Sequence, residues 1–211
     1  MGWKEHLITI YGKQIKDEWF PRIEERIRET KKNMATRMVQ EKKQNVILIT
    51  YPDQISDAEG KLRGFEKFSE QYIKDVFDVI HFLPFCPYSS DDGFSVIDYQ
   101  ELAAGLGTWE DLERISKKYT LMYDFVCNHV SAESTWFQEC LKGNDIYRKY
   151  FIEVEPDTDL TEVTRPRTTP LLTEFETAQG KKSFWTTFSA DQIDLNYANP
   201  EVFYAAIDRC V

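Results

Sequence analysis

Three short apolar runs alternate with amphipathic segments in the middle of the chain. They are Val46–Tyr51, Val79–Leu83 and Thr120–Cys127, and a proline ends each of the first two. Runs of this length, rich in β-branched and aromatic residues, predict β-strands, and the first is expected to be buried on both faces. Because the connections are short and amphipathic, we expect parallel strands joined by right-handed crossovers.

Helical periodicity predicts the elements between and around these strands. Gly64–Asp75 has apolar positions on one side, and a second helix begins after Thr108, where Asp111 would complete a capping box and Leu112 and Ile115 would face inward. Pro200 begins a helix that continues to the C-terminus. Further helices are expected at 19–38 and 134–141, and short strands at 150–154 and 184–188.

An acid interrupts the third apolar run. Asp124 lies among Leu121, Val126 and other apolar residues, and Asn128 and His129 follow. An unpaired buried carboxylate costs several kcal/mol, on the order of 2–7 for a polar group, so Asp124 is expected to have a partner. The alternative is a satisfied structural aspartate followed by a surface histidine.

Polar residues follow each predicted strand. Tyr51-Pro52-Asp53 follows the first, the segment 84–94 with Asp91, Asp92 and Phe94 follows the second, and Asn128-His129 follows the third. Carboxylates and histidine hydrogen-bond hydroxyl groups, and aromatic rings stack on the apolar face of a pyranose, so this set suits a sugar site. The alternative for Asp91 and Asp92 before Gly93 is a turn with no further role.

Composition excludes some classes of protein. The net charge of −10 argues against nucleic acid or an anionic membrane as partner. No apolar run approaches the roughly 20 residues that span a bilayer, and charged residues near the N-terminus interrupt any signal-peptide core, so a cytoplasmic location is expected. No C-x-x-C pair occurs, so we interpret the cysteines as free thiols: Cys86, Cys127, Cys140 and Cys210.

Two dispersed motifs resemble the α-amylase superfamily, glycoside hydrolase family 13. Asp124–His129 is similar to the region at the end of the third barrel strand, and Gln192–Asn196 to a short region near the end of the inserted domain. A closer resemblance is to the sucrose phosphorylase subfamily, and the runs that carry it are 48–51, 81–85, 91–94, 106–109, 128–131 and 165–167.

The resemblance implies an α/β fold, the N-terminal part of a TIM (β/α)8 barrel with strands 1–3, a small inserted domain after strand 3 and an incomplete barrel with an exposed edge. Four segments are expected: an N-terminal helical extension at 1–44, three β/α units at 45–132, the inserted domain at 133–190, and the return to the barrel at 191–211.

Site residues follow from the same resemblance. Asp91 and His129 would hold the hydroxyls of the donor glucosyl unit, Phe94 would form an aromatic wall there, and Arg167 would lie near the acceptor or phosphate. Asp124, Asn128 and Asp194 would be structural residues near the site. The resemblance implies no metal and no cofactor, since the phosphorylase group generally does without the calcium that many amylases hold.

The implied activity is glucosyl transfer from sucrose or a related α-glucoside to phosphate, with an α-glucoside and phosphate as partners and a homodimer of the full-length protein. A retaining transfer needs two carboxyl groups about 5–5.5 Å apart. In the family these follow strands four and five, so no catalytic residue is nominated and this chain is expected to be inactive alone. The alternatives are a hydrolase or transglucosidase of the same family, and a non-catalytic fragment that at most binds sugar.

Overall fold

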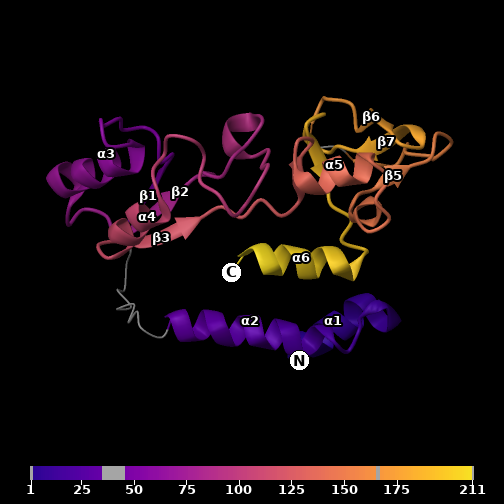
Figure 1. Cartoon of the computed structure of the whole chain (residues 1–211), viewed down its shortest axis with the longest axis horizontal. Coiled ribbons are helices and arrows are strands. Elements are labelled where there is room, and N and C mark those ends of the chain that lie inside the picture. Colours follow the sequence, from indigo (N-terminus) through magenta and orange to yellow (C-terminus); the bar gives the residue numbers. More distant parts are fainter. Residues whose placement is uncertain (1, 35–45, 165–166, 211) are drawn as a thin grey trace. The chain divides into compact units, whose positions relative to one another are not determined.

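The computed structural model describes residues 2–34, 46–164 and 167–210. They form two compact units (Figure 1). One unit comprises residues 39–126, and the other combines residues 1–38 with residues 127–211. Each unit is described by itself.

The unit of residues 39–126 is built on a three-stranded parallel sheet in the order β1-β2-β3. Its strands are β1 (Ile47–Thr50), β2 (Val79–Phe82) and β3 (Thr120–Tyr123). This confirms the predicted parallel strands. The third strand is shorter than predicted and ends at Tyr123, not Cys127, because Pro84 follows Leu83 beside it and cannot donate a ladder hydrogen bond.

The prediction that the first strand is buried on both faces is wrong. β1 is an edge strand of this sheet, and its Ile47 and Ile49 are 46% and 59% exposed. On β3, Met122 and Tyr123 are each 43% exposed. Ile47, Ile49 and Met122 alternate with Leu48 and Leu121, which pack on the core, so they lie on the opposite face of the sheet. The expected uncovered apolar surface of an incomplete barrel is therefore confirmed.

Two helices cover one face of the sheet, the face on which Ile80 and Phe82 contribute to the core. They are α3 (Lys61–Phe68) and α4 (Trp109–Ser116). Phe65 of α3 meets Phe82 of β2 edge to face, with ring centroids 4.9 Å apart, and both rings are buried. The predicted start of α4 is confirmed: the backbone N–H of Thr108 donates to Asp111 Oδ2 at 2.7 Å, and Leu112 and Ile115 are buried.

The helix predicted at Gly64–Asp75 has different bounds. α3 begins at Lys61 and passes into a π-helical turn, η2 (Ser69–Ile73). Here the hydroxyl of Ser69 donates to the carbonyl of Glu66 at 2.8 Å. A hydroxyl that binds the backbone of its own helix competes with the regular ladder, which accounts for the change of winding.

A buried carboxylate joins α3 to α4. Glu66 accepts hydrogen bonds from Arg63 (3.1 Å), Arg114 (3.2 Å) and Lys118 (3.3 Å). Burial alone would raise the pKa of Glu66, but the three cations outweigh it, and the net effect is a lowered pKa. The charge is therefore retained inside the helix pair.

The other unit contains a small antiparallel sheet in the order β5-β7-β6. Its elements are β5 (Glu153–Val154), β6 (Leu172–Thr177), β7 (Gly180–Trp185) and the helix α5 (Thr135–Leu141), with the 3-10 turn η4 (Tyr147–Tyr150). The short helix was predicted correctly. The two strands were predicted with wrong bounds, and β6 was not predicted, because its polar Thr and Glu residues weaken the alternating pattern.

Phe137 of α5 is the centre of this small domain. Its ring is fully buried and meets Phe151, Phe175 and Phe184 at centroid distances of 5.0, 4.8 and 5.1 Å, all near-perpendicular. Edge-to-face pairs of this kind add to the burial of apolar area. A four-ring cluster therefore holds the helix on the sheet.

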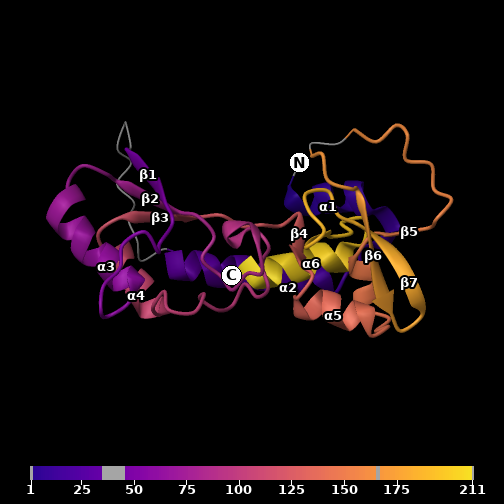
Figure 2. The ribbon, with the colours of Figure 1, turned by 90° about the horizontal axis from the view of Figure 1, so that it is seen from above.

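The N-terminal helices pack against the last helix. They are α1 (Trp3–Tyr11), the 3-10 turn η1 (Gly12–Gln14) and α2 (Trp19–Met34), and the last helix is α6 (Pro200–Cys210). Figures 1 and 2 both show α6 alongside α2. Leu7, Trp19 and Ile23 form the buried centre of this contact, with Phe203 and Ile207 against them. The helix predicted at 19–38 is confirmed to Met34, and 35–38 lie outside the described residues. Helix α1 was not predicted.

Three cysteines among the described residues, Cys86, Cys127 and Cys140, are free thiols, as predicted. Burial raises the pKa of Cys86 and Cys140 to about 11, so both thiols are protonated at neutral pH. The side chain of Cys210 lies outside the described part of the chain. None of the helices in the described ranges combines the length and apolarity needed to cross a bilayer.

Candidate functional site

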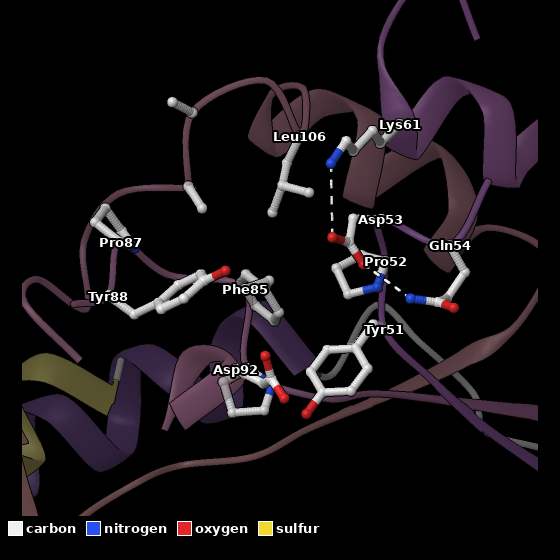
Figure 3. Close-up of a pocket in the computed structure, with 13 residues that line it drawn as sticks. Tyr51, Pro52, Asp53, Gln54, Lys61, Phe85, Pro87, Tyr88, Asp92 and Leu106 are labelled. Carbon is white, nitrogen blue, oxygen red and sulfur yellow. Dashed lines mark hydrogen bonds and ion pairs between the residues drawn. The ribbon is translucent and has the colours of Figure 1, made fainter. Parts of the chain in front are cut away.

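A cleft of about 520 Å³ opens beyond the C-terminal ends of β1 and β2 (Figure 3). Its wall includes aromatic rings and charged groups from the segments that follow these strands. They are Tyr51, Asp53, Lys61, Phe85, Tyr88 and Asp92. Aromatic surface combined with a few placed polar groups is typical of small-molecule sites.

Asp53 is held at one end of this cleft. Its carboxylate lies 3.6 Å from Lys61 Nζ and accepts a hydrogen bond of 3.2 Å from Gln54 (Figure 3). Below Asp53 in Figure 3, the ring of Tyr51 lies beside Asp92. Burial raises the pKa of Tyr51, and the negative charges of Asp92, Asp91 and Asp124 raise it further. The phenol therefore stays protonated at neutral pH and can donate a hydrogen bond.

A tight turn, η3 (Asp91–Gly93), carries the two predicted acids of the second loop. Asp91, Asp92 and Gly93 all have positive φ, of 56°, 48° and 101°. A Cβ on Gly93 would lie 2.8 Å from the carbonyl oxygen of Pro84, so only glycine fits. The turn is real, and it exposes both acids while Phe94 is half-buried. Asp92 lines the cleft, whereas Asp91 and Phe94 are not among its lining residues.

The expected partner of Asp124 is His81. His81 Nε2 lies 3.1 Å from Asp124 Oδ2, and both side chains are largely shielded from water. His81 belongs to β2, and Asp124 directly follows β3, so the bond links two neighbouring strands at their C-terminal ends. The sequence motif showed the acid but not its partner.

The two motifs of the other unit form one antiparallel ladder. The strand β4 (His129–Ser131) pairs with β8 (Gln192–Asp194), and His129 lies directly opposite Asp194. All the residues of both strands are buried. His129 is therefore not a surface histidine.

Asp194 is the polar centre of this ladder. Its carboxylate accepts hydrogen bonds from the backbone N–H of Thr187 (3.2 Å), the Thr187 hydroxyl and the side-chain amide of Asn128 (3.4 Å). Burial raises the pKa of Asp194 despite these donors. Asn128 also lies 3.3 Å from His129 Nδ1, so it connects the acid to the histidine ring.

Phe188 joins two of the predicted site residues. Its ring centroid is 5.2 Å from that of His129, and the guanidinium of Arg167 lies over the same ring at 5.5 Å. The tertiary structure thus brings His129 and Arg167 onto one aromatic side chain, although 38 positions of sequence separate them. Arg167 is exposed, so its N–H groups are open to a ligand.

Sequence reasoning missed His81, Thr187 and Phe188 as parts of these clusters. His81 begins the run 81–85 that carries part of the resemblance, but neither this run nor Trp185–Phe188 indicates which acid its side chains contact. The available signal was the acid: each of Asp124 and Asp194 is held by a neighbour that only the fold identifies.

Comparison with known proteins gives the family. The model of the α-amylase catalytic domain matches residues 25–210. The glucosylglycerate phosphorylase of Escherichia coli K12 is 42% identical over 97% of this chain and 37% of its own length. The glucosylglycerate phosphorylase of Allomeiothermus silvanus is 51% identical over 78% of this chain and 30% of its own length.

Among solved structures, the sucrose 6F-phosphate phosphorylase from Thermoanaerobacter thermosaccharolyticum superimposes with a TM-score of 0.72. It is 29% identical, and the match covers 81% of this chain and 37% of that one. The chain spans about a third of the length of the curated relatives it matches. The α/β fold is accordingly an N-terminal portion of the barrel, with the barrel incomplete.

Proposed function

Because this chain belongs to the α-amylase catalytic-domain family, we propose that it is the N-terminal part of a retaining glucoside phosphorylase. The donor proposed for the whole protein is glucosylglycerate. The observation that carries this choice is the 42% identity to a glucosylglycerate phosphorylase across 97% of the chain. Sucrose and its 6-phosphate rank below it, because relatives named for those substrates are 32–34% identical.

In the proposed reaction, a carboxylate attacks the anomeric carbon, the bond to the glycerate oxygen breaks, and glycerate leaves with a proton from a second carboxyl group. An oxygen of phosphate then displaces the carboxylate and returns its proton to the second carboxyl group, and glucose 1-phosphate is the product. The proposed roles in this chain are binding roles: Asp91 and His129 hold glucosyl hydroxyls, and Phe94 is an apolar wall. The proposed role of Asp124, Asn128 and Asp194 is structural, near the site.

Arg167 is proposed to bind the anionic partner of the glucosyl group. Its guanidinium is exposed and backed by the ring of Phe188, which leaves the N–H edge free. A guanidinium fork matches both carboxylate and phosphate. One arginine can therefore serve the carboxylate of the leaving glycerate and the incoming phosphate in turn.

We further propose that the bond-breaking carboxylates are not part of this chain. The test compares the 211-residue chain with a protein of the relatives' length that contains it, each supplied with glucosylglycerate and phosphate. We expect glucose 1-phosphate from the longer protein and none from the shorter. Turnover by the 211-residue chain would refute the binding-only role, and free glucose as the main product would favour a hydrolase.

The role of Arg167 has its own test in the longer protein. Arg167→Gln should raise the KM for phosphate by about tenfold, the loss of a charged hydrogen bond, while Arg167→Lys should retain part of the affinity. Arg28→Gln is the matched control, because Arg28 is an exposed residue of α2 whose side chain is 73% accessible. An unchanged KM for phosphate in Arg167→Gln would remove Arg167 from the proposed site.

A further inference from the structure

A second cleft, of about 400 Å³, lies wholly within the unit of residues 1–38 and 127–211. Three helical segments form its walls: the start of α2, the segment from α5 to η4, and α6. It contains none of the residues proposed above to bind the glucosyl donor or phosphate. The side chains that line it are mainly aromatic or charged.

Three half-buried rings of the cleft lie in mutual contact. Trp136 and Tyr150 meet at a centroid distance of 5.3 Å and an angle of 88°, and Tyr147 meets Tyr150 at 5.3 Å. Burial, with Glu201 and Tyr147 nearby, raises the pKa of Tyr150, so its phenol remains a hydrogen-bond donor at neutral pH. Ring surface beside phenolic O–H groups suits a ligand that has both an apolar face and hydroxyls, such as a pyranose.

Two of the acids on the cleft wall have cationic partners. Glu201 lies 3.1 Å from Lys16 Nζ, and Asp208 lies 2.5 Å from Arg26. A third acid, Glu18, is exposed, so water and salt screen its charge. The acids therefore do little to repel an anion that enters the cleft.

Two arginines of the cleft have their guanidinium groups over aromatic rings. The guanidinium of Arg22 lies 4.2 Å from the ring centroid of Tyr204, and that of Arg209 lies 5.9 Å from the ring of Trp136. Within the described part of the chain, neither lies within ion-pair distance of a carboxylate. A guanidinium stacked on a ring keeps its planar N–H edge for a bidentate anion.

We propose that this cleft binds a phosphorylated monosaccharide. The phosphate lies against Arg22 and Arg209, and the sugar ring lies against Trp136 and Tyr150. Phosphate accepts two parallel hydrogen bonds from a guanidinium, and two such groups account for binding in a chain whose net charge is −10. The volume of about 400 Å³ accommodates a ligand of this size.

The NMR signals of the tryptophan indole N–H groups provide a test that distinguishes ligand binding at the two candidate sites. Trp136 lines this cleft, whereas the indole N–H of Trp185 donates to Thr187, which binds Asp194. Glucose 1-phosphate is titrated into the 15N-labelled 211-residue chain, with the Trp136 signal assigned through Trp136→Phe. We expect a saturable shift of the Trp136 signal.

Substitutions then assign the phosphate contact. Arg22→Gln and Arg209→Gln should each weaken the Trp136 titration by about tenfold, while Arg28→Gln, on the same helix as Arg22, should leave it unchanged. His129→Asn should also leave the Trp136 titration unchanged. Because His129 belongs to the proposed glucosyl site, this variant separates binding in the second cleft from the proposed function. Circular dichroism of each variant verifies that it is folded.

Three results would overturn the proposal. The first is a Trp136 signal that does not move with glucose 1-phosphate. The second is an equal affinity in Arg22→Gln, Arg209→Gln and Arg28→Gln. The third is equal binding of unphosphorylated glucose, which would remove the phosphate contact, or of inorganic phosphate alone, which would remove the sugar contact.

Discussion

Gly93→Ala is the substitution whose cost can be worked out most directly from the structure. Gly93 has φ of +101°, and an added Cβ would lie 2.8 Å from Pro84 O and 2.9 Å from Pro84 Cβ. The left-handed backbone costs an L-residue about 1–2 kcal/mol, and overpacking costs about 1–3 kcal/mol more. We therefore expect a loss of about 2–5 kcal/mol.

Gly105→Ala is the matched control. Gly105 has φ of +79° in the same unit, but nothing lies within 4 Å of its added Cβ, so only the backbone cost of about 1–2 kcal/mol applies. The gain from a stiffer unfolded chain is the same for both substitutions and cancels in their difference. Gly93→Ala should therefore be less stable than Gly105→Ala by about 1–3 kcal/mol.

Urea unfolding, followed through the indole signal of Trp109, measures this difference. Trp109 is the one tryptophan of residues 39–126 and contacts Phe85 of the cleft. With a slope of about 1–3 kcal/mol per M, the midpoint of Gly93→Ala should be lower by roughly 1 M than that of Gly105→Ala. Equal midpoints for the two variants would refute the argument that the contact with Pro84 requires glycine.

Three further substitutions test the cores and the buried charges. Because the pKa of Glu66 is lowered in the folded protein, this residue contributes stability above its ordinary pKa of 4.5, and that stability is lost as pH falls through the folded pKa. Glu66→Gln should therefore flatten the fall of the urea midpoint between about pH 6 and about pH 3. An unchanged slope would contradict this. Phe137→Ala should cost about 3–5 kcal/mol by thermal unfolding, because three rings lose their common neighbour; a loss below about 1 kcal/mol would be inconsistent with a single packed cluster. His81→Phe should cost about 1–3 kcal/mol, since the Asp124 carboxyl group loses its hydrogen-bond partner. If His81→Phe and Asp124→Asn destabilise additively in a double-mutant cycle, the bond contributes nothing.

The sequence was most informative where an apolar pattern was short, regular and bounded. Pro52 and Pro84 follow the first two strands closely, and Thr108 with Asp111 begins α4 as the capping box requires. Polar β6, by contrast, was not predicted, because strands of a small domain that are covered on one side only carry a weak signal.

Motif reasoning also predicted which acids need partners, since a buried carboxylate is costly wherever it occurs. It could not name the partners. His81 is 43 positions from Asp124, and the register of two parallel strands determines that they meet. In the same way, the β4–β8 ladder puts Asp194 opposite His129, and Phe188 contacts both His129 and Arg167.

The sequence by itself determined the three parallel strands, the start of α4 and the residue types at the strand ends, because these depend on local sterics and on the period of apolar positions. The tertiary structure alone decided which side chains share a site and which apolar faces stay exposed. Ile49 belongs to an apolar run typical of a core strand, but it is 59% exposed, because it lies on the face of the sheet opposite the core-facing Leu48. Burial is a property of neighbours, and neighbours distant in sequence are assigned only by the fold.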